Sequence, residues 1–285
     1  LLSYFILFKG TQKTLGDVFV LTVSGLLIAM YLKKTRRKKI NKWFIVLIIT
    51  VVFVFAIILA TILGERISYL GEIGYDAFKL HTSFYEVNTD SPLLWIFPES
   101  TKIGFCSLIF YLCNGLYGLS VSLGTPFTWS YGIGSMMDLT NIIESRTGVD
   151  FITKSTYMYK AYELHGWHYS EKWHTIFPWL ASDYTFIGAI AILCIATYIY
   201  AICWQEIIQG KNKESIYLFS ILNIMWIYLP ANNQIFSSRT TALIFIICFH
   251  MWRRRKRNVK KRWFFYGKER KNILHIAVSA QRKEI

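Results

Sequence analysis

The chain has 285 residues, of which 54% are hydrophobic, and it carries a formal net charge of +15. Several uncharged runs of 15 to 21 residues exclude an ordinary soluble domain and indicate a protein that crosses a membrane more than once. The positive charge does not indicate nucleic-acid binding, because it is concentrated in two clusters, residues 33–42 and 253–271, which each border an apolar run.

The N-terminal part of the chain predicts two full membrane spans. Residues 1–8 are apolar and begin at Leu1, so we expect the end of a span there and a chain that is the C-terminal part of a longer protein. Residues 18–32 form the first full span, and the basic cluster after it places this end in the cytoplasm. Residues 43–63 return outward, since 21 residues at a rise of 1.5 Å cover about 31 Å, the width of the hydrocarbon core.

Three more apolar runs, residues 184–203, 216–229 and 242–252, predict the C-terminal spans. The last two form a pair whose far ends both carry basic residues, so Asp183 must lie on the outer side. The sequence therefore predicts an all-α polytopic membrane protein with about five full spans and a partial N-terminal one. We expect four regions: N-terminal spans (1–63), a large outer loop (64–183), C-terminal spans (184–252) and a basic cytoplasmic tail (253–285).

Residues 103–123 are long and apolar enough to be a further span. A single crossing here would invert every later helix and put the second basic cluster outside. We therefore predict a re-entrant or surface-lying helix that covers the outer face. The alternative is that this run crosses and that part of residues 125–137 returns.

Residues 173–188 are the stretch that most strongly indicates a site. Pro178 discourages helix at Phe177, which predicts a turn or a broken helix there. Asp183 then occupies the N-cap position of the next span, and His174 lies shortly before it. A carboxylate and an imidazole at the mouth of a membrane helix indicate chemistry. The alternative is an aspartate that only caps a helix beside an interfacial aromatic belt.

The outer regions also contain arginines and tryptophans that suit a phosphorylated glycan. Arginine offers a planar guanidinium group that matches phosphate, and the flat faces of tryptophan can lie against sugar rings. Arg239 lies in residues 231–241, between two short spans, where a charge either faces a cavity or extends to the headgroups. Each residue also has a simpler role, in ion pairs for the arginines and in interface packing for the aromatics.

Several catalytic motifs are absent from the sequence. It contains no D-x-D, no phosphate-binding G-x-x-x-x-G-K-[ST], no H-E-x-x-H and no G-x-S-x-G. These absences argue against a nucleotide-driven pump and a zinc hydrolase. His165, His168 and His174 cluster without a cysteine or carboxylate at helical spacing, so we expect no metal and no cofactor.

Three pieces of the chain resemble the bacterial O-antigen and capsular oligosaccharide repeat-unit polymerases. They are NGLYGLS at 114–120 leading to PFTWSYGIG at 126–134, GW at 166–167 followed by WHTIFPWLASD at 173–183 and FIG at 186–188, and NNQ at 232–234 with FSS at 236–238. The resemblance extends from about residue 95 to residue 245. The related O-antigen ligases resemble these pieces less well.

The resemblance implies a glycosyltransferase on the outer side of the bacterial cytoplasmic membrane. Such enzymes transfer a growing glycan from polyprenyl pyrophosphate to a hydroxyl of the next lipid-linked repeat unit, without a nucleotide. The implied partners are this lipid-linked oligosaccharide, membrane lipids, a chain-length regulator and a flippase. A transporter or flippase for the same glycan, and a structural subunit of an envelope assembly, are the alternatives.

The resemblance also implies a role for each candidate residue. An acceptor hydroxyl needs a base, and a leaving pyrophosphate needs cationic groups. We expect Asp183 to be the base or its orienter, with His174 as the second choice because imidazole titrates near neutral pH. The remaining candidates are Arg66 and Arg239 as phosphate ligands, Arg146 as a reserve ligand, and Trp129, Trp167, Trp173 and Trp179 as glycan contacts.

Overall fold

The computed structural model describes residues 12–35, 42–69, 88, 90–97, 99–169 and 172–255. All regular secondary structure within these ranges is helical, in agreement with the predicted all-α class. The predicted partial span at residues 1–8 and most of the predicted basic tail lie outside the described residues. The elements are α2 (Gln12–Thr35), α3 (Lys42–Tyr69), η1 (Pro92–Ile96), α5 (Glu99–Leu123), α6 (Met137–Thr147), α7 (Phe151–Ser155), α8 (Tyr157–His165), α9 (Ile176–Ile208), α10 (Glu214–Tyr228) and a helix at residues 239–255.

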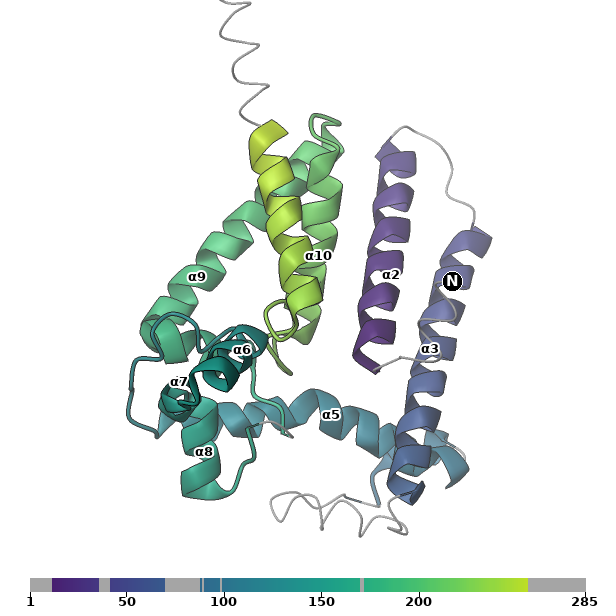
Figure 1. The fold of residues 1–285 in the computed structure, drawn as a ribbon. Helices are drawn as coiled ribbons and strands as arrows, with labels where there is room; N and C mark the ends of the chain where they lie inside the picture. Colours follow the sequence, from purple (N-terminus) through teal and green to yellow (C-terminus); the bar gives the residue numbers. More distant parts are fainter. Residues whose placement is uncertain are drawn as a thin grey trace, which may run out of the picture.

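The helices form two groups with different directions (Figure 1). The long helices α2, α3, α9, α10 and the 239–255 helix extend upward in the view, with α9 tilted, whereas α5 runs across beneath the lower ends of α2 and α10. The short helices α6, α7 and α8 gather at the same end, and we call residues 124–175 the outer layer after the prediction from the sequence that they face outward. Helix α5 thus runs at a steep angle to the long helices, and the prediction that residues 103–123 lie on the surface stays a prediction.

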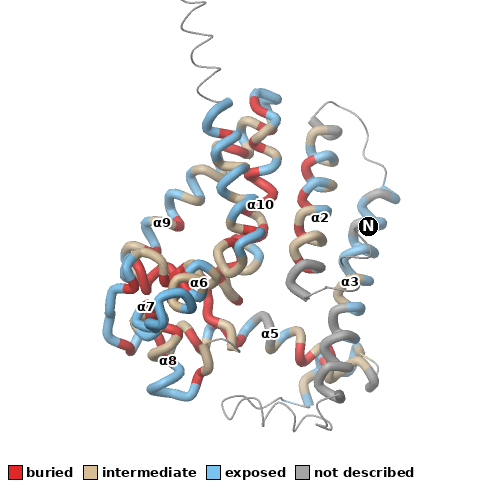
Figure 2. Tube along the Cα trace, viewed as in Figure 1, coloured by how far each residue is buried: buried red, intermediate tan, exposed pale blue. Residues whose placement is uncertain are grey.

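Two described stretches, Thr101–Leu123 and Ile176–Ile208, are long and apolar enough to cross a membrane. Shorter apolar helical stretches lie at Gly16–Leu32, Ile45–Ile58 and Glu214–Tyr228. Large apolar side chains are exposed along α3 and α9, as Figure 2 shows by the many exposed positions on these helices. Helices that present apolar side chains outward are typical of a helical membrane protein. The number of spans stays a prediction.

Helix α10 lies at the centre of the apolar core. Leu218, Ile221, Leu222 and Ile224 of this helix are all buried, and they pack in one cluster with residues of α2 and α9. A helix that is apolar on every side can be stable only when neighbouring helices or lipid surround it, which explains its central place (Figure 2). Through this packing α10 determines where the loop after it, residues 229–238, meets the outer layer.

The predicted break at Phe177 is wrong, because α9 begins before it, at Ile176. Pro178 lies in the first turn of the helix, where a backbone N–H has no helical partner and its loss costs no hydrogen bond. The break comes later in the helix. Thr185 has φ 63° and ψ 168°, a region that residues other than glycine rarely adopt, and it joins two helical pieces across a kink.

Thr185, not Asp183, is the N-cap of the long apolar piece of α9. The Thr185 Oγ1 accepts a hydrogen bond from the backbone N–H of Gly188 at 3.4 Å, the bond that an N-cap side chain makes to the third helical residue. The prediction that Asp183 caps this span is therefore wrong. Asp183 lies just before the kink, and its side chain accepts hydrogen bonds from residues outside α9.

Candidate functional site

The Asp183 carboxylate is buried and accepts three hydrogen bonds from one loop of the outer layer. Its Oδ1 accepts from the Ser130 hydroxyl at 2.5 Å and from the Gly134 backbone N–H at 3.0 Å, and its Oδ2 accepts from the Ser135 backbone N–H at 2.8 Å. Only 4% of Asp183 is exposed. Charge-assisted bonds of this kind are the strong ones, so the carboxylate fixes residues 130–135, which we call the Asp183 loop, to α9.

The residue beside Asp183 adds two further attachments. The backbone N–H of Ser130 donates to the Ser182 carbonyl at 3.1 Å, and the Ser182 hydroxyl accepts from the backbone N–H of Tyr157 at 3.0 Å. The first turns of α9 thus hold both the Asp183 loop and the start of α8. Because the carboxylate is buried and already accepts three hydrogen bonds from the loop, this geometry favours a positioning role for Asp183; its predicted role as a base stays a prediction.

The Asp183 loop holds Tyr131 in a strained backbone conformation. Tyr131 has φ 61°, and Gly132 follows with φ 77°. A left-handed conformation is ordinary for glycine but a genuine outlier for a bulky aromatic residue. Residues held in such regions cost on the order of 1–3 kcal/mol and are found where the surroundings over-determine them, often at functional sites. The strain therefore marks this loop as a candidate site.

His174 lies in a second buried contact, against α5. It is 1% exposed, and neither of its ring nitrogens has a hydrogen-bond partner among the described residues. Gly118 makes this packing possible, because a Cβ there would lie 2.8 Å from the His174 Nδ1. Burial lowers the pKa of His174 to about 3, so the imidazole is neutral at physiological pH. A buried imidazole whose pKa is lowered this far is a weak base, and its predicted catalytic role stays a prediction.

Three other side chains have a buried polar atom without a hydrogen-bond partner among the described residues: Asn114, Thr175 and Asn233. These segments meet because the Thr175 backbone N–H donates to the Gly115 carbonyl at 3.3 Å, and a Cβ at Gly115 would lie 2.5 Å from a carbonyl oxygen of the loop after α10. Buried polar groups are nearly always paired in proteins, so several unpaired ones at one junction indicate a functional rather than a purely packed region.

The structure connects this junction to the Asp183 loop. The Asn233 side-chain amide donates to the Ser135 carbonyl at 3.1 Å, while the Ser135 N–H donates to Asp183. Asn233 belongs to the third piece of the polymerase resemblance and Ser135 directly follows the first. Asp183 ends the main segment of the second piece, so the structure brings all three pieces into one buried polar region.

The three candidate arginines lie apart from this buried region. Arg239 is 70% exposed at the start of the 239–255 helix, and its backbone N–H donates to Asp138 at 2.8 Å. Its Nε lies 3.6 Å from the same carboxylate oxygen. Arg146 is exposed in the last turn of α6, and the side chain of Arg66 lies outside the described side chains. A phosphate site that combines these arginines stays a prediction.

Of the four candidate tryptophans, Trp129 is the most exposed, at 54%. Trp167 is 1% exposed, and its indole N–H donates to the Trp173 carbonyl at 3.1 Å. Trp179 is also buried, and Trp173 is half-buried. A glycan contact by Trp167 or Trp179 stays a prediction, and it would require that a buried ring become accessible.

Sequence reasoning did not identify three residues of this region: Asp138, Tyr131 and Phe151. Tyr131 and Phe151 are exposed, and their rings lie 5.0 Å apart. The dipeptide Tyr131-Gly132 was a local signal, because glycine favours a left-handed turn. Nothing in the sequence indicated that Phe151 would lie beside it, since the intervening α6 determines that contact.

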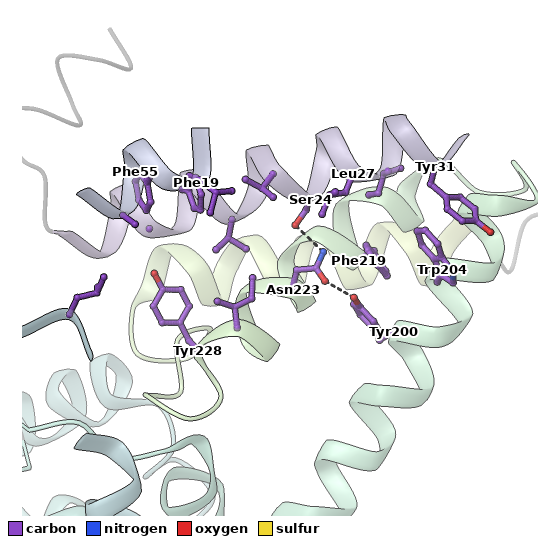
Figure 3. Close-up of a pocket in the computed structure, with 18 residues that line it drawn as sticks. Phe19, Ser24, Leu27, Tyr31, Phe55, Tyr200, Trp204, Phe219, Asn223 and Tyr228 are labelled. Carbon is purple, nitrogen blue, oxygen red and sulfur yellow. Dashed lines mark hydrogen bonds between the residues drawn. The ribbon is translucent and has the colours of Figure 1, made fainter. Parts of the chain in front are cut away.

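An apolar cleft of about 650 Å³ lies between α2 and α3 on one side and α9 and α10 on the other (Figure 3). Most of its lining is apolar or aromatic, such as Phe19 and Phe219. Two hydrogen bonds between side chains cross the cleft. The Asn223 amide donates to the Ser24 hydroxyl at 2.9 Å, and the Tyr200 hydroxyl donates to the Asn223 side-chain oxygen at 2.6 Å. The volume is in the range of natural ligand sites.

One end of the cleft is lined by Tyr228, at the last turn of α10 (Figure 3). Leu108 of α5 also lines the cleft. The other end is lined by Tyr31 and Trp204, whose rings lie 4.8 Å apart. The lining of the cleft thus extends along α2 and is apolar except for the side chains of Ser24, Asn223 and the tyrosines.

Comparison with models of protein families, with curated proteins and with solved structures finds no match to this chain.

Proposed function

We propose that this chain belongs to an enzyme that polymerises lipid-linked oligosaccharide repeat units on the outer side of a bacterial cytoplasmic membrane. The substrates would be two polyprenyl-pyrophosphate-linked glycans, one as donor and one as acceptor. The proposal includes the five full spans predicted from the sequence, with the outer layer on the side opposite to the basic clusters. The motifs of the sequence resemble those of the polymerases, and the shape of the apolar cleft is a separate argument for the proposal.

The single observation that carries the proposal is the apolar cleft whose lining includes Tyr228 at the end of α10 and Leu108 of α5. A polyprenyl chain is long and apolar, and a cleft of about 650 Å³ can hold a part of it. Its end at Tyr228 would place the attached pyrophosphate near the loop after α10. An enzyme for a lipid-linked glycan needs this combination of an apolar site and an adjoining polar layer.

The reaction requires a base and cationic groups beside the sugar. The acceptor hydroxyl oxygen forms a bond to the anomeric carbon of the donor, the bond from that carbon to the pyrophosphate breaks, and the hydroxyl proton passes to a base. Arg239 would stabilise the leaving polyprenyl pyrophosphate. Asp138, whose side chain is 36% exposed and lies against Arg239, would be a better placed base than the buried Asp183.

The buried residues would then have positioning roles. Asp183 would hold the Asp183 loop in place, and His174 would support α5 against the start of α9. Both would affect the rate through the geometry of the site and not through proton transfer.

The test is polymer synthesis in membrane vesicles from cells that make the whole protein, supplied with a synthetic polyprenyl-pyrophosphate-linked repeat unit. We expect a ladder of products on a gel with the natural sequence and with the exposed control Asp90→Asn. We expect Arg239→Ala and Asp138→Asn to lower the rate by about a hundredfold or more, typical for loss of a base or of electrostatic stabilisation. Ladders of normal length and yield in both variants would contradict the assignment.

The alternatives give different results in cells that lack the protein. Loss of a polymerase leaves single repeat units on the outer face, whereas loss of a flippase leaves them on the inner leaflet. Loss of a ligase leaves long polymer on the lipid carrier. The vesicle assay also separates these functions, because neither a flippase nor a structural subunit produces longer glycans from purified repeat units.

A further inference from the structure

Three aromatic rings are exposed together on the outer layer. Trp129 is 54%, Tyr131 53% and Phe151 43% exposed. The Trp129 and Tyr131 ring centroids lie 5.0 Å apart with an interplanar angle of 35°, and the Tyr131 and Phe151 centroids lie 5.0 Å apart edge to face. We call these three rings the aromatic platform. Exposed rings contribute little to folding, so their clustering needs another reason.

The fold holds the aromatic platform rigidly from two sides. On one side the Asp183 loop holds Tyr131 in its left-handed conformation. On the other side α7, which carries Phe151, is fixed to α6, because the Thr153 backbone N–H and hydroxyl donate to Glu144 at 2.8 and 2.5 Å. Rigid aromatic side chains supply contact area at low entropic cost, as a preorganised binding surface requires.

The segment before Trp129 is fixed as well. The Lys160 ammonium donates to the Pro126 carbonyl at 2.9 Å and to the Thr128 hydroxyl. Partial burial lowers the pKa of Lys160. Residues 126–135 are thus held at both ends.

The polar surroundings of the platform include a carboxylate as well as two lysines. Asp150, next to Phe151, forms an exposed ion pair with Lys154 at 2.8 Å. A surface that inserts into anionic lipid typically has a cationic rim, and a carboxylate there would be repelled. A paired carboxylate and ammonium instead offer hydrogen-bond acceptors and donors to hydroxyl groups. Sugar rings combine an apolar C–H face with a rim of hydroxyls, which matches rings bordered by such a pair.

We propose that the aromatic platform binds a sugar ring of the substrate glycan, with the ring face against Tyr131 and Trp129 and its hydroxyls toward Asp150 and Lys154. This inference rests on the proposed function for the identity of the glycan. The platform explains why the chain keeps a strained tyrosine and a buried carboxylate: together they hold exposed aromatic rings in one arrangement.

The test measures binding of the free repeat-unit oligosaccharide, without its lipid, to the whole protein in nanodiscs, and in parallel the KM and kcat of polymer synthesis. Tyr131→Asn removes the ring but tolerates a left-handed backbone, so the fold is kept. Tyr131→Phe keeps the ring and should bind normally. Trp95→Ala, which removes a ring that is 74% exposed in η1, is the matched control.

We expect Tyr131→Asn and Trp129→Ala to weaken oligosaccharide binding and raise KM about tenfold, with kcat little changed. Tyr131→Phe and Trp95→Ala should match the natural sequence. Equal affinity in Tyr131→Asn and the natural sequence would overturn the platform, as would no saturable binding by the natural sequence. If the oligosaccharide binds as expected but no polymer forms, the polymerase proposal fails and the platform stands.

The alternative is that these rings contact the membrane lipids, and fluorescence quenching distinguishes this from sugar binding. Brominated phospholipids quench the fluorescence of tryptophans that lie in the bilayer. We expect the same quenching in Trp129→Phe and the natural sequence. Quenching that disappears with the Trp129 ring would place the platform in the lipid and overturn the proposal.

Discussion

Replacing Asp183 with asparagine separates a carboxylate that holds a loop from one that takes a proton. An amide has one oxygen where the carboxylate has two. If this oxygen keeps the bonds from Ser130 and Gly134, the amide nitrogen must face the Ser135 backbone N–H, donor against donor. A buried N–H without a partner costs about 1–3 kcal/mol, and the two remaining bonds lose their charge. We expect Asp183→Asn to destabilise the loop by about 2–4 kcal/mol.

Limited proteolysis measures this change directly. Residues 126–131 contain three aromatic residues that chymotrypsin can cleave once the loop opens. A loss of about 2–4 kcal/mol raises the open population, and with it the initial cleavage rate, by about thirtyfold to several hundredfold. Ser130→Ala should raise the rate less, since it removes one bond and leaves no N–H unpaired.

Two results would refute the reasoning. If Asp183→Asn is cleaved at the rate of the exposed control Asp90→Asn, the three hydrogen bonds do not hold the loop. If Asp183→Asn also abolishes polymer synthesis while cleavage is unchanged, the carboxylate acts as the base that the sequence predicted.

Three further predictions concern packing, pH and the inner end of the helices. Gly115→Ala should destabilise the protein by about 1–3 kcal/mol in detergent unfolding, because its Cβ would lie 2.5 and 2.9 Å from two backbone carbonyl oxygens; the control Gly25→Ala, with nothing within 4 Å, should be neutral or slightly stabilising. Burial lowers the pKa of His174 from 6.5 to about 3, so the unfolded state binds the extra proton between these values and stability falls by up to about 1.4 kcal/mol per pH unit as the pH drops below 6.5. His174→Gln should remove this slope in unfolding curves at pH 7.5, 6.5 and 5.5, and parallel slopes would contradict it. Trp252→Phe should lower stability by about 1–3 kcal/mol in thermal unfolding, because it removes the indole N–H that donates to the half-buried Glu206 carboxylate at 2.8 Å; an unchanged midpoint would show that this bond contributes nothing.

Local sequence patterns predicted which segments are helical better than they predicted the residues at which the helices begin and end. The apolar run after Asp183 is helical because uncharged residues of this length can be solvated only by lipid or by other helices. The long apolar piece begins after Thr185, close to the predicted residue 184, but the sequence did not predict the helical piece before it, which begins at Ile176 because Pro178 is compatible with a first turn. A proline shows where a helical N–H is missing, but it does not show on which side of it the helix begins.

The role of Asp183 illustrates why the candidate site was only partly predictable. Its position before an apolar run suggested a cap, and a helix-capping rule concerns only neighbouring residues. The kink at Thr185 supplies the cap instead, and the carboxylate binds Ser130, which is 53 residues away in the sequence. No periodicity or spacing reports a contact over that distance.

The sequence by itself determined the helical class and the apolar lengths of the long helices, because both depend on residue type and on periods of a few residues. It also indicated which regions are polar. Only the tertiary structure decided that α5 lies across the other helices, that an apolar cleft opens beside α10, and that Tyr131 and Phe151 form one exposed surface. Those features arise from packing between distant segments, where shape and the pairing of buried polar groups, and not local preference, select the arrangement.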